Sequence, residues 1–265
     1  MRRLHLFEWE DQPWLPHVFR DFMTDHLRFT HNEADRQPVN SAIAARLSQV
    51  LRTAGTNQLV DLCSGAGGPL PAIARILAED FGIKVAVLLT DLYPNATAFH
   101  QMERDSAGQF RGRYDPTPAT DVPGHLDGVR TLFTALHHFR PATVRSLLKD
   151  AVAKRATIAV FEPLERSWRF LFLLTIGSFV RGLTHTPKVG PLTRSRFFFT
   201  YLIPLAPLMF AWDGAVSVLR SYTPAELRSL ADAVTGNGYA WKVERFEVPG
   251  PFGEVPTTCL IGYPC

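Results

Sequence analysis

Two patterns of apolar residues alternate along this chain and predict a protein of mixed strands and helices. Short apolar runs that fit buried strands fall at 59–62, 84–90, 128–136 and 156–161. Between them lie longer segments whose apolar residues recur every three or four positions, the spacing of one helix face. Strands that alternate with helices in this way predict a parallel sheet covered on both faces, which is a doubly wound α/β fold.

Several predicted helices carry signals at their ends. Asn40 or Ser41 can cap the start of a helix that Gly55 closes. Pro141 stands where the first turn of another helix is expected. The segment Thr223–Glu226 (Thr-Pro-Ala-Glu) reads as a capping box with proline at the first helical position.

The remaining elements are less sharply bounded. An amphipathic helix is predicted over 13–29, and a strand and loop around 113–122. The helix after the capping box is expected to close at 236–238, which reads Gly-Asn-Gly. Two last strands, 239–248 and 257–263, would form an antiparallel hairpin and bring the sheet to seven strands.

An apolar insert interrupts this alternation between residues 164 and 220. Phe170–Val180 is mostly apolar and is flanked by arginines, and Phe197–Trp212 carries no charge. Both runs are shorter than the roughly 20 residues of a membrane-spanning helix, and Pro204 and Pro207 interrupt the second. Three interpretations stay open: a helical lid with an apolar substrate pocket, ordinary core or dimer packing, and a membrane-surface patch helped by the arginines.

Composition narrows the class of protein. The 265 residues are 46% hydrophobic and 20% charged, which fits a globular chain with an ample core. The net charge of +3 comes without a Lys/Arg block, so we expect no nucleic-acid partner. Three scattered cysteines are too few for a disulfide framework or a zinc site, and no metal is expected. The first residues lack a signal-peptide core, and a reducing cytoplasm is the expected location.

The most informative segment is 59–68, which reads Leu-Val-Asp-Leu-Cys-Ser-Gly-Ala-Gly-Gly. An apolar strand, a glycine turn and an amphipathic helix follow one another here, as in the opening of a nucleotide-binding βαβ unit. The next predicted strand ends at Asp91, about twenty residues past the loop, where a carboxylate can accept ribose hydroxyls.

Two details distinguish this loop from a dinucleotide fingerprint. The sixth position, counted from Gly65, is Leu70 rather than glycine, and Asp61 lies four positions before Gly65. With an acidic residue followed by alternating glycines, the segment resembles the first motif of class I S-adenosylmethionine-dependent methyltransferases. Cys63 departs from that motif, because it replaces the first glycine.

The resemblance implies a doubly wound, Rossmann-like, seven-stranded α/β domain that binds S-adenosylmethionine. Asp61 would fix the amino group, the loop backbone would contact the methionine moiety, Asp91 would hold the ribose, and Leu92 would pack on adenine. The family's usual acid at the adenine amino group is displaced here, so Asp115, Asp121 or backbone near Ala119 would replace it. The expected cofactor residues are Asp61, Cys63, Ser64, Gly65, Gly67, Asp91, Leu92 and Ala119.

This interpretation treats the chain as a single methyltransferase-like domain in four segments. They are an N-terminal helical cap (1–55), a cofactor-binding core (56–163), an apolar lid insert (164–220), and a last helix with its hairpin (221–265).

Titratable residues follow two of the predicted strands. His137 and His138 come directly after the fourth strand, on the sheet edge where ligands bind in doubly wound folds. His137 is therefore the candidate general base, with a capping or packing role as the alternative. Glu162 ends the fifth strand, where it would bind a cationic acceptor or pair with Arg166.

We expect the protein to methylate a small, fairly lipophilic or aromatic molecule. Two alternatives stay open. One is non-methyl chemistry of the same cofactor, either aminocarboxypropyl transfer or a cyclisation that releases methylthioadenosine. The other is a non-catalytic cofactor-binding protein. No membrane span is expected, although peripheral contact is compatible with the insert, and the sequence does not distinguish a monomer from a homodimer.

Overall fold

The computed structural model describes residues 1–33, 36–190, 192–234, 236, 238–250 and 253–265. The chain divides into two compact units. We call residues 1–31 and 164–222 the helical unit, and residues 32–163 and 223–265 the sheet unit. The segment 1–55, expected as one N-terminal cap, therefore contributes to both units, and residues 164–220 lie in the helical unit.

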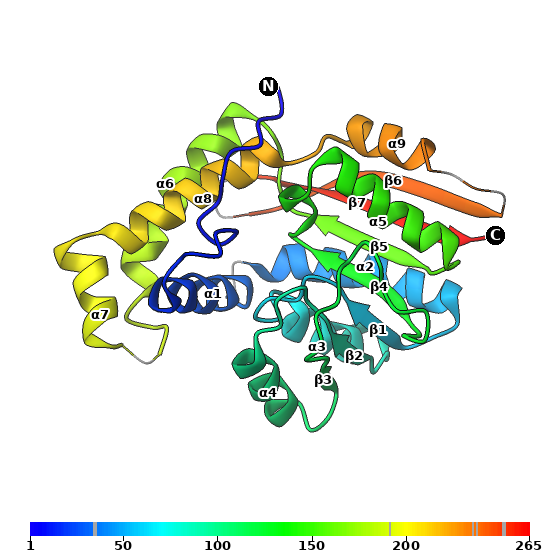
Figure 1. The fold of residues 1–265 in the computed structure, drawn as a ribbon, viewed down its shortest axis with the longest axis horizontal. Helices are drawn as coiled ribbons and strands as arrows, with labels where there is room; N and C mark the ends of the chain where they lie inside the picture. Colours follow the sequence, from blue (N-terminus) through cyan, green and yellow to red (C-terminus); the bar gives the residue numbers. More distant parts are fainter. Residues whose placement is uncertain (34–35, 191, 235, 237, 251–252) are drawn as a thin grey trace. The chain divides into compact units, whose positions relative to one another are not determined.

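The sheet unit is built on one seven-stranded sheet with the order β3-β2-β1-β4-β5-β7-β6 (Figure 1). The first five strands are parallel, and β7 runs antiparallel to both β5 and β6. The predicted fold class and the final antiparallel hairpin are confirmed. The strands are β1 (Gln58–Asp61), β2 (Ala86–Leu89), β3 (Phe110–Gly112), β4 (Val129–Phe133), β5 (Ile158–Glu162), β6 (Tyr239–Val248) and β7 (Val255–Pro264).

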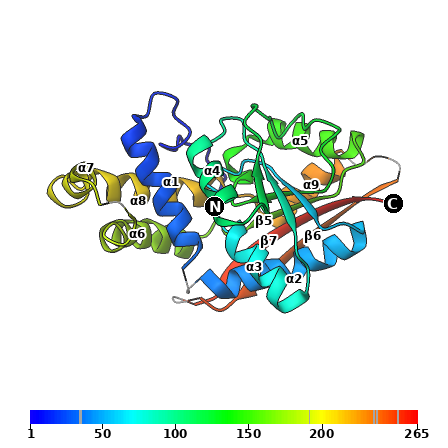
Figure 2. The same ribbon diagram turned by 90° about the horizontal axis from the view of Figure 1, so that it is seen from below.

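Helices cover both faces of this sheet, with α2 and α3 on one side and α5 and α9 on the other (Figure 2). The large core between α2, α3, α4 and the strands includes Leu47, Ile73, Phe99 and Phe161, each almost completely buried. The helices of this unit are α2 (Gln37–Ala54), α3 (Leu70–Phe81), α4 (Ala96–Asp105), η2 (Leu136–His138), α5 (Pro141–Ala153) and α9 (Pro224–Asp232).

Most predicted helix ends in the sheet unit are confirmed. Gly55 closes α2 with φ +64°, α5 begins at Pro141, and the Thr223–Glu226 capping box forms in both directions. The predicted start of α2 at Asn40 or Ser41 is wrong. The helix begins earlier, with Pro38 in its first turn, because proline lacks the amide that would go unpaired there.

Two other predicted boundaries need correction. The third strand is Phe110–Gly112, and it precedes the predicted stretch 113–122. The last helix ends at Asp232, before the predicted Gly236–Gly238 closure. Asn237 of that closure and residues 251–252 of the predicted final turn lie outside the described residues.

The helical unit consists of α1 (His17–His31), α6 (Trp168–His185), α7 (Arg194–Phe197), η3 (Phe198–Leu202) and α8 (Leu205–Arg220). Small residues bring α6 and α8 together: a Cβ on Gly182 would lie 2.8 Å from the Phe210 ring, and one on Gly214 would lie 2.7 Å from Ser178 Oγ. As predicted, the chain breaks at Pro204. Pro207 does not interrupt α8, because it lies in the first turn, where its missing N–H is not needed.

Among the described residues, no single helix has the length and apolar composition needed to cross a membrane. The bent pair Arg194–Leu202 and Leu205–Arg220, with an angle of 72°, meets the length and composition test only when both helices are taken together.

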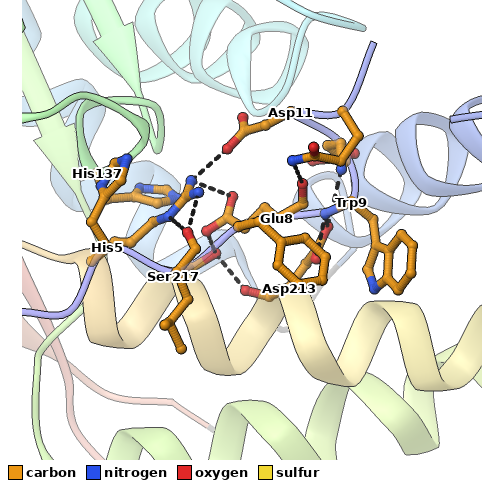
Figure 3. A network of polar contacts seen from close by, with 12 residues as sticks. His5, Glu8, Trp9, Asp11, His137, Asp213 and Ser217 are labelled. Atoms are coloured by element: carbon orange, nitrogen blue, oxygen red, sulfur yellow. Dashed lines mark hydrogen bonds and ion pairs between the residues drawn. The ribbon is translucent and has the colours of Figure 1, made fainter. Parts of the chain in front are cut away.

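A buried polar network ties the N-terminal segment to α8 (Figure 3). Arg220 is 2% exposed and pairs with Asp11 at 2.6 Å and Glu8 at 3.4 Å. The Asp213 carboxylate accepts hydrogen bonds from the backbone amides of Trp9 and Glu10. Both Asp213 and Arg220 therefore find their partners in the first residues of the chain.

Candidate functional site

The loop between β1 and α3 turns through residues with left-handed backbone. Cys63, Gly65, Gly67 and Gly68 have φ of +58°, +52°, +94° and +46°. At Gly67 the φ of +94° favours glycine, and a Cβ would lie 2.3 Å from Met102 Sδ, so the methionine side chain would have to move. At Gly65 no atom lies within 4 Å of a Cβ position, so the backbone there is open to a ligand. Cys63 adopts the conformation that the family's glycine would supply, at a cost in strain.

Asp61 lies at the end of β1, buried beneath this loop and 3% exposed. Its Oδ1 accepts a hydrogen bond of 2.8 Å from the hydroxyl of Thr131, its register partner on β4. Burial, together with the nearby Asp91 carboxylate, raises the pKa of Asp61 to about 7. Among the described residues no lysine or arginine forms an ion pair with Asp61.

Asp91, directly after β2, holds the loop from the other side. Its two carboxylate oxygens accept the backbone amides of Gly65 and Tyr93, each at 2.9 Å. Burial raises the pKa of Asp91, and these amide hydrogen bonds oppose that shift. Ser64 completes the arrangement, because its amide donates to Thr90 O and its hydroxyl accepts the Thr90 amide.

On the predicted adenine side, Leu92 is 45% exposed, and Ala119 is buried. The two acids proposed as substitutes are exposed and paired: Asp115 with Arg113 at 3.2 Å, and Asp121 with Lys154 at 2.8 Å. The structure therefore brings neither carboxylate into the Asp61–Asp91 cluster.

His137 and Glu162 form a buried pair at the ends of β4 and β5. His137 Nδ1 lies 2.9 Å from Glu162 Oε2, and the other carboxylate oxygen accepts the Leu136 amide at 2.7 Å. The expected ion pair between Glu162 and Arg166 would join the two units, so it stays a prediction. Arg166 donates to the Ser221 carbonyl, and Glu162 is committed to the turn that carries His137.

Sequence reasoning missed Thr131 and Thr90, which position Asp61 and Ser64. Thr90 also donates its hydroxyl to the Asp61 carbonyl at 2.8 Å. The signal was indirect: in a doubly wound sheet β1 lies between β2 and β4, so residues that end these strands meet. Which pairs meet depends on register, which the apolar pattern does not specify.

These residues gather where the direction of the sheet reverses. From β1 the chain proceeds to β2 and β3 on one side, and then crosses to β4 and β5 on the other. Ligands of doubly wound folds bind at the carboxyl ends of the strands beside this reversal. Here that edge offers the buried carboxylate of Asp61, the half-buried carboxylate of Asp91, an open glycine backbone and a histidine–glutamate pair.

No protein-family model and no curated protein sequence matches this chain. Solved structures do match it. The plantazolicin methyltransferase BamL, in complex with a triazolic desmethylPZN analog and SAH, is similar with a TM-score of 0.51 and 12% identity, over 93% of this chain and 98% of BamL. PigF with SAH gives a TM-score of 0.50 and 17% identity, over 96% of this chain and 62% of PigF.

The chain has the class I methyltransferase fold. The methyltransferase fold explains the final antiparallel strand, which a purely parallel doubly wound sheet lacks. In this fold β1, β2 and β4 are parallel, so the loop after β1, the end of β2 and the end of β4 lie at the same edge of the sheet. At these levels of identity the similarity establishes the fold alone.

Proposed function

We propose that the protein is an S-adenosylmethionine-dependent methyltransferase that acts on a small, lipophilic or aromatic molecule. The observation that carries this proposal is the pair of carboxylates beside an open glycine loop, of which Asp61 is buried and Asp91 is half-buried. Among the described residues no lysine or arginine forms an ion pair with either carboxylate, and such a pair of carboxylates suits a cofactor that carries an ammonium and a sulfonium. They would repel the phosphates of a dinucleotide.

Each cofactor residue has a role that its position supports. Asp61 would accept the ammonium, and the backbone of Cys63, Ser64, Gly65 and Gly67 would cradle the methionine moiety. On the nucleoside side, Asp91 would accept ribose hydroxyls, Leu92 would pack on adenine, and the backbone at Ala119 would contact its edge. When bound, the cofactor supplies the electrophilic methyl group. The protein's contribution is to orient the acceptor and to exclude water.

BamL and PigF support the choice of cofactor, since both solved structures hold SAH. BamL also holds an analog of a small-molecule acceptor. Residues 164–220 remain the proposed lid over the acceptor.

His137 is the proposed base for an acceptor that must lose a proton. Glu162 would hold the Nδ1 side of the ring and stabilise the imidazolium, so that the other ring nitrogen takes the proton. His137→Ala should then lower single-turnover rates by about 10²–10⁴-fold and leave cofactor affinity nearly unchanged. A normal rate per folded molecule would assign His137 to the structure of the turn instead.

Calorimetry with S-adenosylhomocysteine tests the cofactor assignment. Asp91→Ala should weaken binding by about 1–3 kcal/mol, because the ribose hydroxyls lose a charged acceptor. Asp80→Ala, which removes an exposed acid near the end of α3, is the matched control and should bind as wild type does. Wild-type protein that binds no S-adenosylhomocysteine would refute the proposal. Release of methylthioadenosine during turnover would refute methyl transfer but retain the cofactor.

A further inference from the structure

One face of α6 exposes a continuous row of large apolar side chains. Trp168, Phe172, Ile176 and Val180 follow at intervals of four residues and are 74%, 65%, 47% and 47% exposed. We call this row the α6 stripe. Residues four apart lie on one side of a helix, so the stripe runs along the helix rather than around it. Exposed apolar surface of this extent marks a site of interaction.

The opposite face of α6 is already occupied. Ser178 and Gly182 face α8, where they meet Gly214, Pro207 and the Phe210 ring. These contact positions are offset by two residues from Ile176 and Val180, and two residues of a helix turn through about 200°. The α6 stripe therefore points away from α8 and is not part of the helix–helix contact.

A second apolar surface adjoins the C-terminal half of α6. Phe197, Phe198, Leu202 and Ile203, in and beside η3, are all exposed. The Tyr201 hydroxyl donates to the Leu183 carbonyl at 2.7 Å, which ties η3 to the end of α6. The two surfaces thus belong to one part of the helical unit.

The charged residues of the segment 164–222 are mostly basic. Between residues 164 and 222 the only acids are Glu165 and Asp213, and Asp213 is buried against backbone amides. The bases of the same segment are Arg166, Arg169, Arg181, Lys188, Arg194, Arg196 and Arg220. Arg196 and Arg220 are buried and paired with acids of residues 1–31, so the exposed bases are Arg169, Lys188 and Arg194. Arg169 follows Trp168 at one end of the stripe, and Arg181 follows Val180 at the other.

We propose that the α6 stripe and the η3 segment bind reversibly to the surface of an anionic lipid bilayer. Apolar side chains enter the interface, with Trp168 at the level of the headgroups, while the basic residues attract anionic lipid. The proposal goes beyond the proposed methyl transfer and does not depend on it.

Sedimentation of the full-length protein with lipid vesicles tests this surface. Wild type should sediment with mixed phosphatidylglycerol–phosphatidylcholine vesicles, and much less with pure phosphatidylcholine. Phe172→Glu should reduce the bound fraction at least about tenfold, because it loses a buried ring and adds a repelled charge. Tyr263→Glu, an exposed position on β7 of the sheet unit, should sediment as wild type does.

Other results would overturn the proposal. The proposal fails if wild type does not sediment with anionic vesicles, or if it sediments equally with both lipids. It also fails if wild type is a dimer that Phe172→Glu dissociates. A Phe172→Glu protein that keeps vesicle binding but loses acceptor turnover would assign the stripe to the substrate pocket. Each variant is checked for an unchanged melting temperature. Calorimetry with S-adenosylhomocysteine is run in parallel, so that failure of vesicle binding is separated from failure of the proposed function.

Discussion

The sheet unit and the helical unit distribute apolar and charged side chains differently. Among the described residues, the large exposed apolar side chains of the sheet unit are Leu92, Tyr93, Tyr114 and Tyr263, and all the others belong to the helical unit. The helical unit buries Glu8, Arg196, Asp213 and Arg220. The sheet unit buries charged residues too, among them Asp61, Arg130 and Glu162, so the two units differ mainly in how many large apolar side chains they expose.

This difference indicates what holds each unit together. The core of the sheet unit spans three helices and most of its strands. The helical unit has a small cluster formed by Leu15, Phe22, Met23, Ala206, Met209 and Phe210. The attachment of its N-terminal segment to α8 depends in addition on buried ion pairs. Removing one partner of such a pair leaves a buried charge uncompensated.

The largest expected effect follows from this dependence. Arg220→Met should destabilise the helical unit by about 3–5 kcal/mol, because Glu8 is left buried and the Leu6 carbonyl loses its donor. The N-terminal segment should become sensitive to limited proteolysis, while the sheet unit keeps its cooperative melting transition. Calorimetric unfolding combined with mass spectrometry of the fragments measures both.

Arg194→Met, at an exposed position on α7, is the matched control and should change stability by less than about 0.5 kcal/mol. If Arg194→Met and Arg220→Met changed stability equally, the buried network would not be what holds the N-terminal segment on α8. Simultaneous loss of both units in Arg220→Met would show that they unfold as one.

The sheet unit also holds a buried charge, but one whose removal should stabilise it. Because the pKa of Asp61 is about 7 when folded and 3.8 in a model peptide, folding stability falls as pH rises between these values. At pH 8, Asp61→Asn should raise the free energy of unfolding by about 2–4 kcal/mol, since its amide oxygen keeps the Thr131 hydrogen bond. Binding of S-adenosylhomocysteine should weaken in the same variant.

Asp150→Asn is the contrast for this prediction. Asp150 is buried too, but it pairs with Arg130 at 2.7 Å, so its neutralisation should destabilise the protein. Denaturant titrations of both variants at pH 5 and pH 8 measure the difference. A loss of stability in Asp61→Asn at pH 8 would indicate that the carboxylate is stabilised by a partner that the geometry does not reveal.

The same contrast separates what the sequence could predict from what it could not. The strands other than β3, together with Gly55, Pro141 and the capping box of the sheet unit, are set by local patterns, and they were predictable. The partners of Arg220 were not, because Asp11 lies 209 residues away in the sequence and no periodicity links them. Glu162 was placed correctly at the end of a strand, but its bond to His137 depends on how two strands align.

A smaller expected effect is the loss of stability of the helical unit at acidic pH, which depends on His26. Burial, together with the positive charges of His185 and Arg181, lowers the pKa of His26 to about 3. Below pH 6.5 His26 becomes protonated in the unfolded chain but stays neutral in the folded helical unit. The free energy of unfolding therefore falls as pH falls. At pH 5 the loss should be about 2 kcal/mol relative to pH 8.

His26→Phe should remove most of this loss, because a phenyl ring keeps the stacking on Phe210 and cannot be protonated. His17→Phe, at an exposed position at the start of α1, should keep it. Urea titrations that monitor the helical unit at pH 5 and pH 8 measure the effect. If His26→Phe shows the wild-type dependence on pH, then His26 does not limit the acid stability of this unit.

The smallest expected effect concerns the one position at which the loop of the sheet unit departs from its pattern. Cys63 has φ +58°, and the left-handed region costs a residue with a Cβ about 1–2 kcal/mol. Glycine removes that strain but makes the unfolded chain more flexible, so Cys63→Gly should stabilise the protein by only about 0.5–1 kcal/mol. Ala107→Gly is the control, because Ala107 has φ +50° in the turn after α4 and its substitution changes stability only through the backbone.

Thermal unfolding of both variants, with calorimetry of S-adenosylhomocysteine, separates strain from side-chain packing. If Cys63→Gly loses stability while Ala107→Gly gains it, the Cys63 thiol contributes packing that outweighs the backbone strain.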